Sequence, residues 1–184
     1  EFRRVLFRSI DLKPLDEHAS RQLAGELLKS LPQAPPVLSE LVVQRAGGNP
    51  FYMEELVRML VDQGAIATAG NRWTLHPDKL LATQIPASLT GVLQARLDGL
   101  PAAERLALQQ ASVIGPVFWD QALAALDPRA PAALPALVRR GLAEPRLDAM
   151  LEGMREYVFG HQILHEVTYA TVLGRTKRAL HARA

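Results

Sequence analysis

Apolar residues recur at helical spacing three times in the first third of the chain. The first run follows Asp16, a residue type that caps helices, and stops at the proline-rich stretch LPQAPP. The second run ends at the glycine pair 47–48, and the third begins directly after it and reaches about Gln63. We expect three short helices that form a small bundle over residues 10–66.

The pattern then changes twice. Residues 65–76 alternate around a Gly-Asn turn, which predicts a hairpin or an extended linker, and we place a linker at 67–84. Four helical segments follow, separated by Pro and Gly signals: SLTGVLQARLDGL, PAAERLALQQASVIG, FWDQALAAL and PAALPALVRRGL. Two strand-like pieces, AEPRL and MREYVF, come next. Helices followed by a β-hairpin are the order of elements in a winged-helix domain, which we assign to 85–160.

The last segment contains HQILHEVTYATVL and GRTKRALHARA, which predict a C-terminal pair of helices over 161–184. The predicted fold class is therefore mainly α. It combines a small helical bundle with a winged-helix domain that has a short β-hairpin wing, and it ends in the helix pair.

The composition, with 48% hydrophobic and 22% charged residues among 184, is that of an ordinary globular protein. There is no cysteine, which excludes disulfides, thiolate metal sites and a thiol nucleophile. No apolar run is long enough to cross a bilayer and no stretch has the layout of a secretory signal. We expect a cytoplasmic protein with no membrane partner.

The opening stretch EFRRVLFRS decides how the charge is interpreted. The chain carries 21 Lys and Arg against 19 Asp and Glu, a net charge of +2; without Glu1, Arg3, Arg4 and Arg8 the count is 18 against 18. The stretch could be a basic arm or a native edge strand, but it resembles the in-frame translation of a common sequencing-library adapter. We expect residues 1–9 to be such an artefact, and the neutral remainder gives no electrostatic reason for a nucleic-acid partner.

The first candidate site is GGNPFYMEEL, residues 47–56. Helix punctuation alone explains Gly48, Asn49 and Pro50 as a helix end, a cap and a first-turn proline. It does not explain the two aromatic residues of the first turn, Phe51 and Tyr52. Because a helix N-terminus presents free N–H groups and a positive dipole end, a phosphate or carboxylate ligand is the alternative.

A second candidate is the histidine pair of FGHQILHEVTY, His161 and His165, which lie on one face of a predicted helix. A zinc-protease helix has Glu directly after the first His, where this chain has Gln162, and no third ligand is apparent. We predict no metal site. We expect His165 to cap or pack, whereas His161, between the predicted hairpin and a helix N-terminus, could meet a ligand.

Arg139 and Arg140 end the segment that would be the recognition helix if the winged helix bound DNA. The rest of that segment is Ala, Leu and Pro, whereas DNA-reading helices carry several polar side chains along one face. A structural or regulatory winged helix is therefore favoured. Four charged residues on two predicted helices are expected to be solvated or salt-bridged: Glu54, Glu55, Arg96 and Asp98.

The chain also lacks GxxxxGK[ST] and GxSxG motifs and paired carboxylates in a plausible cleft. We predict no catalytic residues.

Six segments in order carry a family resemblance: LKPLDEHASRQL, RAGGNPFYMEELVRMLVDQG, IPASLTGVLQARLDGLP, ASVIGPVF, LVRRGL and FGHQILHEVTYATVL. Together they resemble the signal-transduction ATPases with numerous domains, in particular the bacterial branch fused to class III adenylate cyclases and LuxR-type regulators. The resemblance spans residues 10–180. It implies a helical lid at 10–66, a winged helix at 85–160 and the start of a helical repeat region at 161–184.

The resemblance also implies nucleotide-binding residues. The family's GxP motif, whose proline packs against adenine, falls on Gly48, Asn49 and Pro50, next to Phe51. The family's winged-helix histidine, which approaches the β-phosphate of bound ADP, falls on His161. In related immune receptors an Asp follows this histidine, whereas Gln162 follows it here.

The implied cofactor is ATP or ADP in a longer parent protein, with magnesium held by a P-loop domain that this chain lacks. The implied partners are that domain in cis, downstream helical repeats, and an output domain that is a cyclase or binds DNA. We expect no tight nucleotide binding by this chain alone. Two alternatives stay open: a DNA-binding winged-helix transcription regulator, and a helical protein-interaction scaffold that binds no nucleotide.

Overall fold

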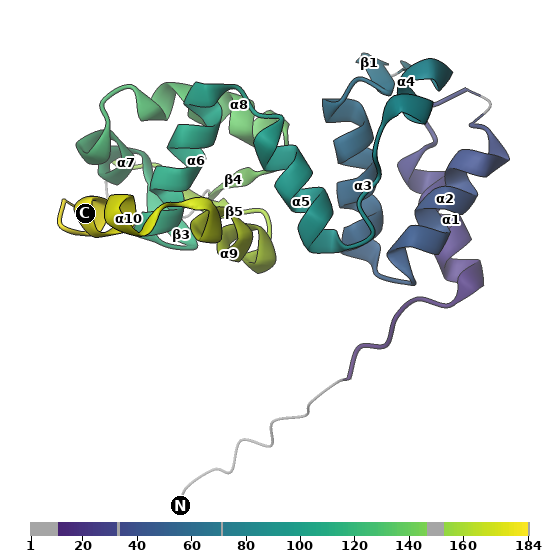
Figure 1. Ribbon diagram of the computed structural model, residues 1–184, viewed down its shortest axis with the longest axis horizontal. Helices are drawn as coiled ribbons and strands as arrows, with labels where there is room; N and C mark the ends of the chain where they lie inside the picture. Colours follow the sequence, from purple (N-terminus) through teal and green to yellow (C-terminus); the bar gives the residue numbers. More distant parts are fainter. Residues whose placement is uncertain (1–10, 33, 71, 147–152, 184) are drawn as a thin grey trace, which may run out of the picture.

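The computed structural model describes residues 11–32, 34–70, 72–146 and 153–183, and within them the chain is mainly helical with two small antiparallel sheets (Figure 1). The mainly α class predicted from the sequence is confirmed. None of the helices in these segments combines the length and apolar character that a membrane crossing requires.

The first part of the chain, residues 11–82, is called the N-terminal unit. It contains α1 (Glu17–Leu27), α2 (Pro36–Ala46), α3 (Pro50–Asp62), β1 (Ile66–Ala69), β2 (Arg72–Leu75) and α4 (Pro77–Ala82). The predicted cap of α1 is confirmed, because Asp16 accepts a hydrogen bond of 2.8 Å from the backbone N–H of Ala19. The three predicted helices are therefore present.

Residues 65–76 were expected to form either a hairpin or an extended linker, and the structure shows the hairpin. Strands β1 and β2 pair antiparallel, with Ile66 opposite Leu75 and Ala69 opposite Arg72. The hairpin packs on the helices, since Ile66 is fully buried in the core of the N-terminal unit and Trp73 lies against the same core. Helix α4 was not predicted, because six residues are too few to show a helical period.

Residues 102–183 are called the C-terminal unit. Its elements are α6 (Ala102–Ile114), β3 (Val117–Trp119), α7 (Asp120–Leu126), a 3-10 turn (Ala130–Ala133), α8 (Leu134–Arg139), β4 (Ala143–Arg146), β5 (Glu156–Phe159), α9 (Gln162–Thr171) and α10 (Gly174–His181). The predicted strand pair is confirmed as β4 and β5, which pair antiparallel with Ala143 opposite Phe159. The turn expected between them, at 147–152, lies outside the described residues.

One boundary prediction was wrong. Phe118 and Trp119 were expected in a helix but belong to β3, which pairs with β5 so that Phe118 lies opposite Tyr157. The cause is tertiary: the Gly115-Pro116 step ends α6, and the open edge of β5 offers backbone hydrogen bonds that a helix start could not use. The sheet order is β3-β5-β4.

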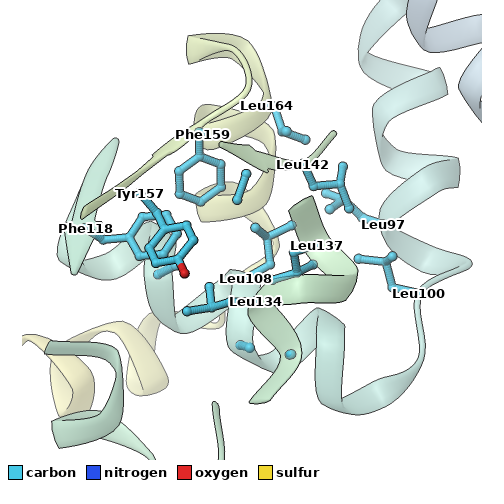
Figure 2. Close-up of a cluster of buried hydrophobic side chains, with 14 of the residues drawn as sticks. Leu97, Leu100, Leu108, Phe118, Leu134, Leu137, Leu142, Tyr157, Phe159 and Leu164 are labelled. Carbon is cyan, nitrogen blue, oxygen red and sulfur yellow. The ribbon is translucent and has the colours of Figure 1, made fainter. Parts of the chain in front are cut away.

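The sheet supplies the aromatic part of the C-terminal core (Figure 2). The Phe118 ring lies 5.8 Å from the Tyr157 ring and 5.7 Å from the Phe159 ring, centroid to centroid. Leucines of the helices close the core on the other side, among them Leu97, Leu108, Leu134, Leu137 and Leu164.

Helix α5 (Leu89–Asp98) lies between the two units and belongs to both cores (Figure 1). Val92 is buried in the N-terminal core, whereas Leu93 and Leu97 are buried in the C-terminal core. Adjacent residues of a helix point about 100° apart, so one helix can fill two cores at once. The two units are thus joined through a shared helix as well as through side-chain contacts.

Candidate functional site

The start of α3 is the first candidate site predicted from the sequence. Asn49 has the extended backbone of a helix cap, and its Oδ1 accepts a hydrogen bond of 3.1 Å from the backbone N–H of Tyr52. Pro50 follows as the first helical residue and is exposed. The side-chain oxygen of Asn49 therefore satisfies one of the free N–H groups that a ligand could have used.

Replacing Asn49 with alanine is expected to lower the free energy of unfolding by about 1 kcal/mol, because the Tyr52 N–H loses its acceptor. Urea unfolding followed by circular dichroism measures this change. Asn49→Ser, which keeps a capping oxygen, should stay within about 0.5 kcal/mol of the original chain. An equal loss in both variants would show that the cap is not the cause.

Gly48 is held by the segment that precedes α1. Its carbonyl accepts a hydrogen bond of 2.8 Å from the backbone N–H of Leu15. A Cβ at position 48 would lie 2.4 Å from the Leu15 carbonyl oxygen, so no other residue fits without moving the backbone. Because the Gly48 carbonyl already accepts from Leu15, it is not available to a ligand. Gly48 instead fixes the path of the backbone into α3.

Tyr52, one of the two first-turn aromatics that helix punctuation left unexplained, has a structural role. Its side chain is buried, and the phenol donates a hydrogen bond of 3.0 Å to the carbonyl of Pro86. Burial raises the pKa of Tyr52, against an opposing effect of the Arg45 charge. The bond ties the start of α3 to the segment that leads into α5.

Phe51, the other aromatic, stacks on His161. The two rings lie 4.0 Å apart between centroids with an interplanar angle of 17°. Phe51 comes from α3 of the N-terminal unit, and His161 directly precedes α9 of the C-terminal unit. Two residues that the sequence singled out separately, 110 positions apart, therefore meet in one contact between the units.

His161 caps α9 with its ring. Its Nδ1 accepts a hydrogen bond of 3.2 Å from the backbone N–H of Ile163, which places the proton of the neutral imidazole on Nε2. His161 is exposed, and its Nε2 has no hydrogen-bond partner in the described part of the chain. The stack thus leaves one N–H donor free to reach an anionic ligand.

Gly160 positions this histidine. A Cβ at position 160 would lie 2.6 Å from the carbonyl oxygen of Gly141, so the chain passes too close to the loop before β4 for a side chain. The backbone N–H of Gly160 also donates to the carbonyl of Leu142, at 3.3 Å. Because Gly160 has no side chain, the end of β5 can pass close to Gly141 directly before His161, the cap of α9.

His165, the second histidine of the predicted pair, faces the core. Its Nε2 lies 3.0 Å from the carbonyl oxygen of Ser112, and its ring packs edge-on against Phe159 at 5.1 Å. Among the described residues, no group of three or more His, Asp or Glu side chains is arranged to hold a metal ion.

A buried ionic network also joins the two units. Arg96 of α5 is 2% exposed; its Nε donates to Asp62 at 2.9 Å, its Nη1 pairs with Glu55, and its Nη2 donates to the carbonyl of Arg140 at 2.7 Å. The expectation of a solvated face was wrong for Glu55 and Arg96, and the salt-bridged alternative holds. The missed signal was the spacing of Glu55, which shares a helix face with Tyr52 and Met59, both of which are buried.

Arg140 extends the network into the C-terminal unit. Its Nη1 donates to Asp62 at 2.7 Å and its Nε to Glu104 at 2.9 Å. Burial opposes the charge, but the Asp62 and Glu104 carboxylates outweigh it and raise the pKa of Arg140. The network therefore spans α3, α5, α6 and the end of α8.

Of the five residues predicted to bind a ligand, the structure brings Phe51 and His161 together. The other three lie directly before Phe51: Gly48 in the turn, Asn49 as the helix cap and Pro50 as the first residue of α3. The chain matches no protein-family model and no curated protein.

Proposed function

We propose that this chain is the lid and winged-helix part of a nucleotide-switched signal-transduction ATPase. In that role it would clamp ATP or ADP together with a P-loop domain and pass the nucleotide state to an output domain. The observation that carries the proposal is the stack of Phe51 on His161, at 4.0 Å between the ring centroids. It joins the two units through His161, on which the resemblance places a nucleotide contact, and through Phe51, which directly follows the residues of the family's GxP motif.

A nucleotide-dependent switch needs contacts that exist in one arrangement of the units and not in another. We propose that the stack serves as such a contact; its support is that Phe51 and His161 lie on different units and share no backbone hydrogen bond. Both residues also lie at helix N-termini, those of α3 and α9, where the helix dipole favours an anion.

The residues fit a contributory role toward ATP or ADP. The Nε2 of His161 is free to donate to a phosphate oxygen, and Pro50 and Phe51 offer apolar surface for a base. The Oδ1 of Asn49 and the carbonyl of Gly48 already have protein partners. One donor and a small apolar surface cannot hold a triphosphate, so the phosphates and magnesium would depend on the P-loop domain.

Titration of the purified chain with ADP tests whether nucleotide binding depends on the P-loop domain. We expect a dissociation constant above about 1 mM, which corresponds to a binding free energy weaker than about −4 kcal/mol. Isothermal titration calorimetry measures it. Micromolar binding by the chain alone would contradict the assignment of the phosphate contacts to another domain.

Replacing His161 with alanine in a longer protein that contains this chain tests whether the stack passes the nucleotide state to the output domain. Loss of the stack should shift that protein toward its active state, measured as output activity at saturating ADP. His18→Ala is the matched control, since His18 is exposed on α1. Unchanged ADP-dependent switching in the His161 variant would favour the interaction-scaffold alternative.

The ion pairs of Arg140 argue against the DNA-binding alternative. Its guanidinium donates to Asp62 and Glu104, and of the two arginines at the end of α8 only Arg139 is exposed. Phosphate binding by several basic residues gives an affinity that falls steeply with salt. Duplex binding with such a salt dependence would favour this alternative over the nucleotide switch.

A further inference from the structure

A cleft of about 650 Å³ opens between the two units, and residues from Glu54 to Asp62 line it along α3. In Figure 1, α3 and α8 lie on opposite sides of α5, and side chains from all three line this cleft. None of the five residues proposed to contact nucleotide, all of which the structure describes, lines this cleft. A ligand bound in the cleft would therefore contact other residues than those proposed to contact nucleotide.

One wall of the cleft is apolar. It is formed by Leu27 of α1, Val57 and Val61 of α3, and the half-exposed indole of Trp73 from β2. The opposite wall contains Ala136 of α8, whose small side chain leaves room. The volume is in the range of small-molecule sites, which occur preferentially between structural units.

The polar groups of the cleft divide into two sets. Asp62, Glu104 and the underlying Glu55 are paired with Arg96 and Arg140, so these charges are compensated within the protein. Two further guanidiniums, those of Arg58 and Arg139, also line the cleft, together with one carboxylate, Glu54.

The donors of these two arginines are largely free. Arg139 is exposed and forms no ion pair with any residue that the structure describes. The Arg58 side chain is 43% exposed; its Nη1 donates to the carbonyl of Arg140 at 3.3 Å, and its Nε is 3.8 Å from Glu55. A guanidinium has five N–H donors, so most of those on Arg58 and Arg139 face solvent or the cleft.

We propose that the cleft binds a small planar anion: an aromatic ring that carries a carboxylate, sulfonate or phosphate group. The ring packs against Trp73 and the valines of α3, and the acidic group accepts hydrogen bonds from Arg139 and Arg58. Guanidinium donors match such oxyanions in geometry and charge. A ligand in this position contacts both units.

The test uses 1-anilinonaphthalene-8-sulfonate, an aromatic sulfonate that fluoresces in apolar surroundings. The chain has two tryptophans, and Trp119→Phe leaves Trp73 as the single reporter. This change should be tolerated, because the buried Trp119 Nε1 has no partner among the described residues. We expect saturable quenching of Trp73 by one bound probe per chain.

Arg139→Ala in the same background is expected to lower the affinity for the probe by roughly tenfold, the loss typical of one charge-assisted hydrogen bond. Arg139 is exposed, so folding should be unchanged, and circular dichroism checks this. Arg178→Ala, an exposed arginine of α10 outside the cleft, is the matched control and should leave the affinity unchanged.

A neutral analogue separates charge from hydrophobicity. We expect 1-naphthalenesulfonate to displace the probe and 1-naphthalenemethanol to do so at least about tenfold more weakly. Equal displacement by both compounds, an affinity unaffected by Arg139→Ala, or no quenching of Trp73 would each overturn the proposal.

Discussion

Replacing Arg96 with alanine is expected to lower the free energy of unfolding by about 3–5 kcal/mol, because it leaves buried carboxylates without their partner. Glu55 is 3% exposed and has Arg96 as its closest cation, while the nearest atom of Arg58 is 3.8 Å away. Asp62 keeps one ion pair, to Arg140. Most of the loss should therefore come from Glu55.

Guanidinium chloride unfolding at pH 7 measures this loss. The control is Arg105→Ala, an exposed arginine of α6 for which we expect a change within about 0.5 kcal/mol. Replacing both partners with methionine, Glu55→Met with Arg96→Met, should recover much of the stability, since an apolar pair removes the unpaired charge. A single Arg96 variant as stable as the control would show that the network does not hold the units together.

Replacing Gly48 with alanine is expected to cost about 2–4 kcal/mol, the sum of a left-handed backbone penalty and a steric clash. The φ angle of Gly48 is +81°, and an added Cβ would lie 2.4 Å from the carbonyl oxygen of Leu15 and 2.9 Å from the Cβ of Pro14. Because the first of these atoms is backbone, no side-chain rotation relieves the clash.

Gly25→Ala is the matched control within the same unit. Gly25 lies inside α1, and its added Cβ would meet no atom within 4 Å. Alanine there should stabilise the chain by about 0.5–1 kcal/mol, because glycine disfavours a helix interior. Thermal unfolding of the two variants should therefore move in opposite directions. A neutral Gly48→Ala would mean that the segment before α1 does not pack on the turn as described.

The Gly48 result also bears on the proposed function. If Gly48→Ala weakens nucleotide-dependent behaviour in a longer protein, the cause can be displacement of the turn rather than loss of a ligand contact. The comparison with Asn49→Ala resolves this, since that variant removes a capping oxygen and leaves the close contact of Gly48 with Leu15 in place. Only a functional loss beyond the stability loss supports a direct role.

Helix boundaries could be predicted where a side chain satisfies backbone groups of its own helix. Asp16 and Asn49 accept from N–H groups three residues ahead, and Pro50 has the fixed backbone angle of a first helical residue. These interactions are local, so residue type and spacing alone imply them. The β4–β5 pair was predictable because two strand-like stretches lie close together in the sequence.

Long-range contacts could not be predicted in this way. Strand β3 exists because β5, forty residues later, offers an edge, and its two aromatic residues fit equally well at a helix start. The exposure of Arg96 was misjudged because its partners Glu55 and Asp62 lie on another helix. Only the packing of α3 on α5 turns these ordinary charged residues into a buried network.

In the candidate site, too, local features could be predicted and long-range contacts could not. The caps and turns that place Phe51 and His161 at helix starts could be predicted from the sequence, because such features depend on neighbours within four residues. Three features depend on the tertiary structure: the two rings stack, Arg140 but not Arg139 forms ion pairs with residues that the structure describes, and a cleft separates α3 from α8. Those outcomes depend on how two cores share helix α5, and no local pattern specifies the angle at which helices pack.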